Sequence, residues 1–171
     1  MKILIISLFL TLSFTTAAIA QNKSIYTSTK TSACRTIKSS SEGTGSYIGE
    51  CRGVGGYKAR LIEGDIRQTL DIVTPARKKF ELNFWNFYSS FSSIGEKLEW
   101  RVQSGVPIAL IARYNVSNPE DPQRSTSYLM VSRIGRGLSC VTDIVGPGPK
   151  QNEEARRLAD EAPGKPCRAS Q

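Results

Sequence analysis

The sequence contains no histidine. This absence excludes Ser-His-Asp and Cys-His catalytic machinery, and it removes imidazole as a zinc ligand and as the commonest general base near neutral pH. The chain also lacks a G-x-S-x-G elbow, a P-loop and a Rossmann glycine pattern. Its glycine-rich run, Gly53–Gly56, precedes a strand-like segment, so it predicts a turn and not a phosphate site at a helix N-terminus. Sequence motifs therefore indicate no catalytic centre, no cofactor and no metal.

Long hydrophobic runs are absent after the first residues. Lys2 precedes an apolar stretch, Ile3–Leu12, which is about half the length of roughly 20 residues that a spanning helix needs. Ala18-Ile19-Ala20 then gives the small-x-small pattern that signal peptidases cleave. We therefore predict a signal peptide over residues 1–20, cleaved after Ala20, with an uncleaved anchor as the alternative. The mature protein is expected to be periplasmic or secreted and not to span a membrane.

Cysteine is scarce, and no two cysteines form a C-x2-4-C pair. The four residues are Cys34, Cys51, Cys140 and Cys167. An even number in an exported chain indicates disulfides, whereas structural zinc usually takes closely spaced ligands. We prefer the pairing Cys34–Cys51 with Cys140–Cys167, because each pair closes a short segment rich in turn residues. The nested pairing, Cys34–Cys167 with Cys51–Cys140, remains open.

Acidic residues are outnumbered, with 15 Asp and Glu against 23 Lys and Arg. The densest basic groups are 77–79, Arg133 with Arg136, and Arg156 with Arg157. A basic exported protein is attracted to anionic surfaces such as lipopolysaccharide, phospholipid or acidic polysaccharide, although positive charge also simply keeps a small domain in solution. No basic stripe alternates with stacking aromatics, so we expect no nucleic-acid partner.

The mature chain divides into an arm and one domain. Residues 21–46 are dominated by Ser, Thr, Lys and Gly, a composition that predicts a flexible arm tied down only at Cys34. Residues 47–171 are long enough for a single disulfide-stapled domain with its own core.

Strand and helix patterns fill that domain. Alternating or continuous apolar runs bounded by turn residues predict strands at 47–51, 57–62, 67–73, 97–103, 107–116, 127–134 and 138–145. Gly64 is expected to supply the positive φ in one of the turns. Ala155, Leu158 and Ala159 fall on one side of a predicted helix over 152–162. The fold class is therefore mainly β: an antiparallel sheet or sandwich of about seven to eight strands, with one C-terminal helix and two disulfides.

Residues 75–91 are ambiguous. Aromatic residues recur at helical spacing after Thr74-Pro75, which resembles a helix start. Aromatics favour strands, however, and the Asn and Ser residues between them are indifferent helix formers. A short strand followed by an irregular aromatic loop is slightly favoured over a helix.

This segment also supplies the candidate binding surface. Trp85 stands beside Asn83 and Asn86 among further aromatics, a set that stacks on sugars and donates amide hydrogen bonds, or that simply forms core. The candidate binding residues are Arg77, Lys78, Lys79, Trp85 and Tyr88.

Carboxylates are the only remaining catalytic groups, since two acids about 5 to 10 Å apart hydrolyse glycosides. The candidates are Glu63, Asp65, Asp71, Glu99 and Asp143. Asp143 is the most interesting because an acid within an apolar strand can have a raised pKa, although an outward-facing position is the simpler reading.

Several short motifs resemble those of a group of small, uncharacterised, exported bacterial proteins with two disulfides. The matching motifs are Gly49-Glu50-Cys51, Gly55-Gly56-Tyr57, Gly64-Asp65-Ile66-Arg67, Gly95, Glu99-Trp100-Arg101, Pro107-Ile108-Ala109, Cys140, Ala155-Arg156, Leu158-Ala159-Asp160 and Cys167. The resemblance implies a periplasmic location, and it indicates neither an activity nor functional residues. We expect a non-catalytic protein that binds an anionic envelope component or another protein. A lysozyme-type hydrolase inhibitor and a carboxylate-based glycan hydrolase are the alternatives.

Overall fold

A computed structural model describes residues 22–169, so the predicted signal peptide and its cleavage site lie outside the described residues. The described part contains ten strands and one α-helix. The strands are β1 (Lys23–Ser28), β2 (Cys34–Ser40), β3 (Ser46–Arg52), β4 (Lys58–Gly64), β5 (Arg67–Val73), β6 (Lys79–Glu81), β7 (Ser92–Gln103), β8 (Val106–Ser117), β9 (Ser125–Arg133) and β10 (Cys140–Val145). The helix α1 (Gln151–Glu161) follows them, one residue earlier than expected.

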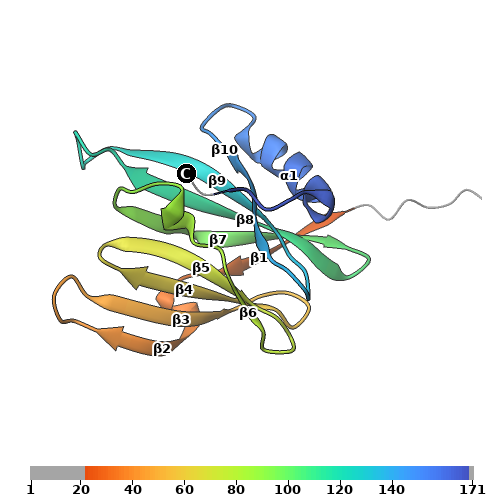
Figure 1. Cartoon of the computed structure of the whole chain (residues 1–171), viewed down its shortest axis with the longest axis horizontal. Coiled ribbons are helices and arrows are strands. Elements are labelled where there is room, and N and C mark those ends of the chain that lie inside the picture. Colours follow the sequence, from red (N-terminus) through yellow and green to blue (C-terminus); the bar gives the residue numbers. More distant parts are fainter. Residues whose placement is uncertain (1–21, 170–171) are drawn as a thin grey trace, which may run out of the picture.

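The strands form one sheet in the order β10-β9-β8-β7-β5-β4-β3-β2, with β1 added to β7 and β6 added to β5 (Figure 1). Every pairing is antiparallel except one parallel bridge between β5 and β7, where Arg67 lies opposite Ser92. The mainly β fold class with a C-terminal helix is confirmed. The sheet has more strands than expected, and the single parallel bridge makes it mixed.

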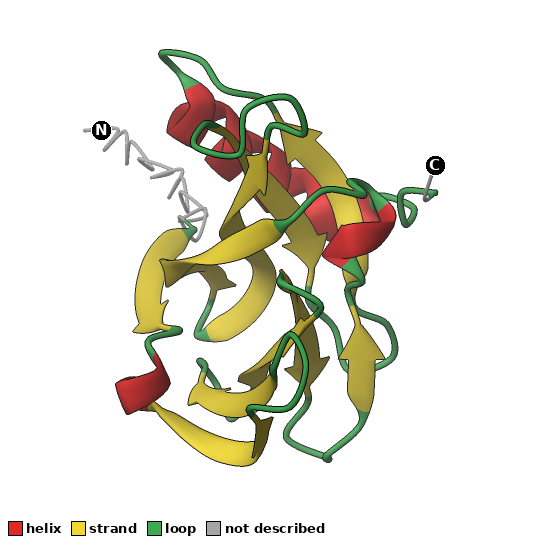
Figure 2. Cartoon of the chain, turned by 90° about the vertical axis from the view of Figure 1, so that its left-hand side faces the viewer, coloured by secondary structure: helices red, strands yellow, loops and turns green. Residues whose placement is uncertain are grey.

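The sheet is strongly curved (Figure 2). One large apolar cluster joins its two halves. The cluster joins Leu61 and Ile72 of the β2–β6 half to Trp100 and Met130 of the β7–β10 half, and all four are at most 5% exposed. A second, smaller cluster lies on the opposite face of β8 and β9, against Ala155, Ala159 and Ala162 of the helical end. The layers of the protein are therefore, in order, the β2–β6 half of the sheet, the large core, the β7–β10 half of the sheet and helix α1.

Strand β8 shows why its sequence is apolar almost throughout. Leu110 and Ala112 face the large core, whereas Ala109 and Ile111 face the helix. Because both faces of the strand are covered, period-two alternation is lost and a continuous apolar run replaces it.

The structure differs from the expected flexible arm over residues 21–46. Residues 23–28 form β1, which pairs with β7, and residues 34–40 form β2, which pairs with β3. Ile25 packs against the large core, and Cys34 is bonded to Cys51. Backbone pairing with the distant β7 and with the adjacent β3 thus orders a segment whose own composition offers little to bury.

The two disulfides are Cys34–Cys51 and Cys140–Cys167, which span 17 and 27 positions of sequence. The preferred pairing is confirmed and the nested alternative is wrong.

Residues 75–91 follow the favoured interpretation of a short strand and an irregular loop. The strand is β6, and a single 3-10 turn covers Phe84–Asn86. Arg77 and Asn83 adopt φ values of 64° and 47°, which end any regular structure at those points. Of the helices in residues 22–169, none has both the length and the apolar character that crossing a membrane requires.

Candidate functional site

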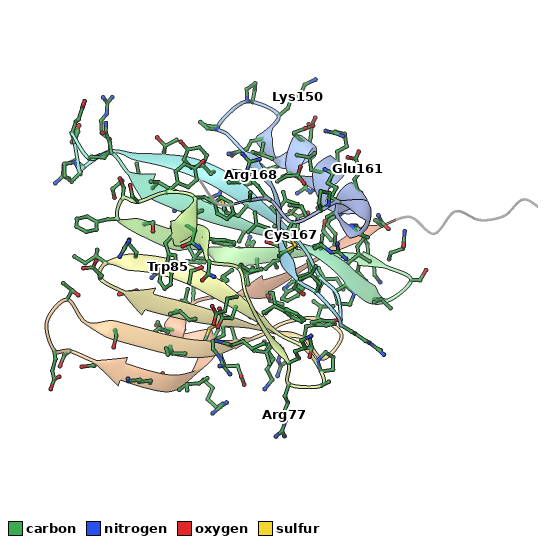
Figure 3. All side chains as sticks on the ribbon, in the orientation of Figure 1. Arg77, Trp85, Lys150, Glu161, Cys167 and Arg168 are labelled. Carbon is green, nitrogen blue, oxygen red and sulfur yellow. A yellow bond between two sulfur atoms is a disulfide. The ribbon has the colours of Figure 1, made fainter. Side chains whose placement is uncertain are left out.

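The turn 75–79 carries the three predicted basic residues. Arg77 is exposed at the tip and points away from the molecule in Figure 3. Lys78 places its Nζ 4.7 Å from the centre of the Phe80 ring and 3.3 Å from a backbone carbonyl, both neutral groups. Lys79 instead lies 2.7 Å from Glu81 Oε1. Arg77 and Lys78 therefore present their charge to solvent, whereas the charge of Lys79 is engaged by a carboxylate.

A basic hollow of about 400 Å³ borders this turn. Arg35, Arg52 and Lys58 line it together with Glu50. A Cβ at Gly56, also in the lining, would lie 3.3 Å from Pro75, so the hollow and the turn are adjacent. We call this hollow and the turn together the basic surface, defined by Arg35, Arg52, Lys58, Arg77 and Lys78.

Glu50 lines the hollow and pairs with the cations around it. Its carboxylate lies 2.6 Å from Lys58 Nζ, 3.0 Å from Arg35 Nη2 and 3.2 Å from Arg60 Nη2, and its side chain is 8% exposed. The hydrogen bond from Lys58, followed by those from the two arginines, lowers the pKa of Glu50 to about 2 against the cost of burial. The ionised Glu50 carboxylate thus pairs with three cations. The hollow keeps a net positive charge because Arg35, Arg52 and Lys58 outnumber Glu50 in its lining.

Asp71 lies opposite Arg60, a partner of Glu50, in the pairing of β4 with β5. The residue is 1% exposed, and burial raises its pKa even though Lys79 lies 3.5 Å from Oδ2. Lys79 therefore offsets a buried carboxylate and stabilises the strand pairing of β5 with β6.

The five candidate catalytic carboxylates are each engaged by a different neighbour. The pairs are Glu63 with Gln68, Asp65 with Arg67, Asp71 with Lys79, Glu99 with Arg156, and Asp143 with Lys165. Asp143, the most interesting from sequence, has its carboxylate oxygens 3.0 and 3.1 Å from Lys165 Nζ and is not isolated among apolar groups. These pairings favour structural roles for the five acids.

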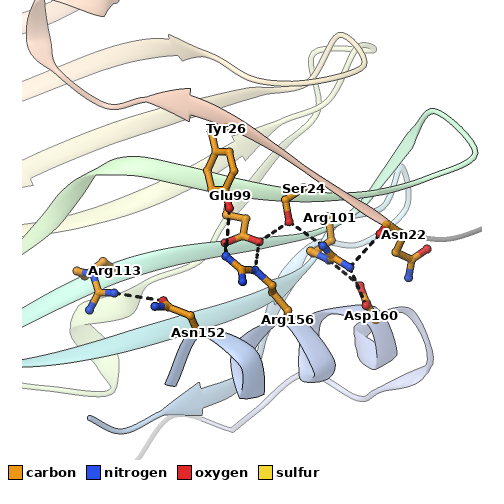
Figure 4. A network of polar contacts seen from close by, with 9 residues as sticks. All are labelled: Asn22, Ser24, Tyr26, Glu99, Arg101, Arg113, Asn152, Arg156 and Asp160. Carbon is orange, nitrogen blue, oxygen red and sulfur yellow. Dashed lines mark hydrogen bonds and ion pairs between the residues drawn. The ribbon is translucent and has the colours of Figure 1, made fainter. Parts of the chain in front are cut away.

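A polar network fastens α1 to the sheet (Figure 4). Arg156 Nε donates to Glu99 Oε1 at 2.7 Å, and its Nη2 donates to the Tyr26 hydroxyl at 3.1 Å. Ser24 also donates to Glu99. Both arginines of the basic group are accordingly engaged by carboxylates: Arg156 by Glu99 of the sheet, and the exposed Arg157 by Glu154 and Glu161 along the helix.

The predicted aromatic residues lead to a second candidate site. Trp85 is half-buried on the 3-10 turn (Figure 3). Tyr88 stacks on Tyr128 of β9, with ring centroids 4.4 Å apart and planes inclined by 28°. Burial raises the pKa of Tyr88 to about 12, so its phenol stays protonated.

Two hollows of about 160 and 170 Å³ share Phe87 and Arg168 in their linings. The first is also lined by the Tyr88–Tyr128 stack, and the second by Asn83 and Asn86. We call the two together the aromatic groove, defined by Asn83, Asn86, Phe87, Tyr88, Tyr128 and Arg168.

Arg168 reaches the groove because the chain end is fixed there. Cys167 is bonded to Cys140 at the start of β10, and the Arg168 backbone N–H donates to the Val141 carbonyl at 2.8 Å. Figure 3 shows Cys167 and Arg168 over the sheet, above the 3-10 turn that carries Trp85.

The structure thus separates the predicted binding residues into two sites. Arg77 and Lys78 belong to the basic surface, and Tyr88 belongs to the aromatic groove, with Trp85 beside it. Sequence reasoning missed further members of both sites, namely Arg35, Arg52, Lys58, Tyr128 and Arg168. A signal existed for Arg35, because pairing Cys34 with Cys51 on antiparallel strands places Arg35 opposite Glu50.

No family model, no curated protein and no solved structure matches the chain. Among residues 22–169, no three His, Cys, Asp or Glu side chains gather as the ligands of a metal ion would. The two sites must therefore be interpreted from their own chemistry.

Proposed function

We propose that the chain is an exported, non-catalytic protein that binds an acidic glycan of the cell envelope through the basic surface. The observation that carries this proposal is the concentration of Arg35, Arg52 and Lys58 around one hollow, directly beside the exposed Arg77 and Lys78. Carboxylate or phosphate groups along a polymer match such a set of separated cations.

The arrangement suits a polymer better than a small buried substrate. The hollow is open to solvent, and the adjacent turn extends the positive surface beyond it. Glu50 orients two of these cations, Arg35 and Lys58, and stays ionised because of its low pKa, so the surface keeps the same charge pattern throughout the physiological pH range. Binding through such a surface depends strongly on ionic strength, because exposed charges are screened within about 10 Å at 0.1 M salt.

Export is supported by the two disulfides, since such bonds persist in oxidising compartments and are rare where thiols are kept reduced. The formal net charge of +8 for the full chain also favours encounter with the anionic polymers of an envelope.

The test measures binding of the oxidised protein to polygalacturonate, with neutral dextran as the control polymer. We expect saturable binding to polygalacturonate that weakens as salt rises, and no binding to dextran. The double variant Arg77→Ala with Lys78→Ala should bind roughly ten- to thirtyfold more weakly at low salt, because each exposed cation contributes about 1 kcal/mol near an anionic surface.

Arg124→Ala is the matched control, since Arg124 is also an exposed cation, with its side chain 80% exposed, and lies in the loop between β8 and β9. Equal binding to both polymers, or equal losses in the double variant and in Arg124→Ala, would contradict the proposal. Vesicles of anionic phospholipid form a further arm, and binding to them without binding to polygalacturonate would replace the glycan by a lipid surface.

A further inference from the structure

We infer that the aromatic groove is a second site, which binds a single sugar ring bearing a carboxylate. The inference rests on residues that the proposed function does not use, so either can fail without the other. Three kinds of group converge in the groove, and each matches one part of an acidic sugar.

The first kind is aromatic. Phe87, Tyr88 and Tyr128 line one hollow and are each half-buried, so they are ordered yet still accessible. The Tyr88 ring centre also lies 6.1 Å from that of the fully buried Tyr114, so Tyr114 and Tyr128 together hold the ring in place. A rigid aromatic wall of this kind packs against the C–H face of a pyranose with little loss of conformational entropy.

The second kind is amide. Asn83 and Asn86 line the adjoining hollow on the 3-10 turn, and Asn83 is held in a left-handed conformation with φ 47°. Side-chain amides both donate and accept hydrogen bonds, as sugar hydroxyls do. The hollows measure only about 160 and 170 Å³, a size suited to one ring and not to a longer chain.

The third kind is a cation. Arg168 lines both hollows and is fixed by the neighbouring disulfide and by its backbone bond to Val141. A guanidinium binds a carboxylate through two parallel hydrogen bonds, which gives orientation as well as affinity. Glu81 also lines the second hollow, but its carboxylate is engaged by Lys79 at 2.7 Å, so its repulsion of an acidic ligand is reduced.

The sugar carboxylate would therefore lie on Arg168 at the junction of the two hollows. Its ring would pack along the Tyr88–Tyr128 wall, and its hydroxyls would meet Asn83 and Asn86. The Cys140–Cys167 bond contributes to the site because, together with the hydrogen bond from the Arg168 backbone N–H to the Val141 carbonyl, it holds Arg168 close to Phe87.

The test titrates the oxidised protein with glucuronate, glucose and acetate, and follows backbone and side-chain amide resonances. We expect saturable shifts with glucuronate, centred on Asn83, Asn86 and Arg168. Glucose, which has the ring without the acid, should bind about tenfold more weakly, and acetate, which has the acid without the ring, should not saturate.

Arg168→Ala should lower glucuronate affinity about tenfold, to the level of glucose, and leave glucose binding unchanged. Asn86→Ala, at an exposed position, should weaken both sugars equally. Arg124→Ala controls for net charge, and Arg77→Ala with Lys78→Ala should leave glucuronate binding unchanged. The absence of glucuronate binding, shifts centred elsewhere, or equal affinity for glucose and glucuronate in the unaltered protein would each overturn the inference.

Discussion

Arg101 and Asp160 form a two-pronged ion pair, with Arg101 Nε 2.7 Å from Asp160 Oδ1 and Nη2 2.8 Å from Oδ2. Arg101 lies on β7 and Asp160 on α1, and Arg101 Nη1 also donates to Ser24 Oγ of β1 at 2.6 Å (Figure 4). One guanidinium, 10% exposed, thereby connects the N-terminal strand, the central sheet and the helix.

Asp160→Asn should destabilise the protein by about 2 kcal/mol, because it leaves a largely buried guanidinium without its carboxylate. The estimate is below the range for fully buried pairs, since the Asp160 side chain is 33% exposed. The midpoint of urea unfolding measures the effect. Glu154→Gln removes a carboxylate from the exposed pair with Arg157 and should change stability by less than about 0.5 kcal/mol. Equal effects of the two variants would show that Asp160 has no special role.

The low pKa of Glu50 predicts that the protein loses stability in acid. Its folded-state pKa is about 2 and its ordinary value is 4.5, so its contribution is complete above about pH 4.5 and is lost as the pH falls toward 2. Glu50→Gln should therefore be less stable than the unaltered protein by roughly 1 to 2 kcal/mol at neutral pH, allowing for screening of the exposed cations. Urea unfolding across this pH range should show the two curves converging near pH 2, and a difference independent of pH would refute the role of the charge.

Ile66 adopts φ 57° at the tip of the β4–β5 hairpin, a conformation that a β-branched residue rarely takes. Ile66→Gly should raise stability by about 0.5 to 1 kcal/mol, because relief of this strain exceeds the added flexibility of the unfolded chain. Val106→Gly is the contrasting variant: Val106 is also exposed and β-branched, but it lies in strand β8, so the change should lower stability. Thermal unfolding distinguishes these outcomes, and a loss of stability in both variants would show that Ile66 is not strained.

Replacing Cys140 and Cys167 together by serine should cost roughly 3 to 4 kcal/mol, from the loop entropy of the 27-position span. Where it remains folded, the double variant should also bind glucuronate about tenfold more weakly, as Arg168→Ala does, because Arg168 is no longer fixed at the groove. Replacing Cys34 and Cys51 should cost slightly less and leave the groove intact. Glucuronate affinity unchanged in the first variant would mean that Arg168 reaches the groove without the bond.

Much of the fold could be predicted from local patterns. The sequence shows alternating apolar residues in β5 and β7, a continuous apolar run in β8 and alanines on one side of α1. These patterns can be recognised because the side chains that face the core recur with the period of the strand or helix. Strands β1 and β2 could not be predicted in this way, since their order comes from hydrogen bonds to β7 and β3 and not from their own composition.

The β4–β5 turn shows a second limit. Gly64 was the natural choice for positive φ, yet Asp65 and Ile66 take it, at 54° and 57°. Strand register decides which residues occupy the tip of a hairpin, and the register is set by side chains on both strands. The candidate sites show a similar limit. The 75–91 segment could be recognised from its sequence, but Tyr128 and Arg168 lie at distant positions, and the folded sheet and the second disulfide bring them to it.

The pairing of β1 with β7 has a consequence for the order of assembly. Ser24 and Glu99 are in contact although they are 75 positions apart, so β1 can pair only after the distant β7 has become available. Contacts of such long sequence separation slow folding. The Ser- and Thr-containing composition of β1 is then an advantage, because a short, polar strand is less prone to aggregate while it is unpaired.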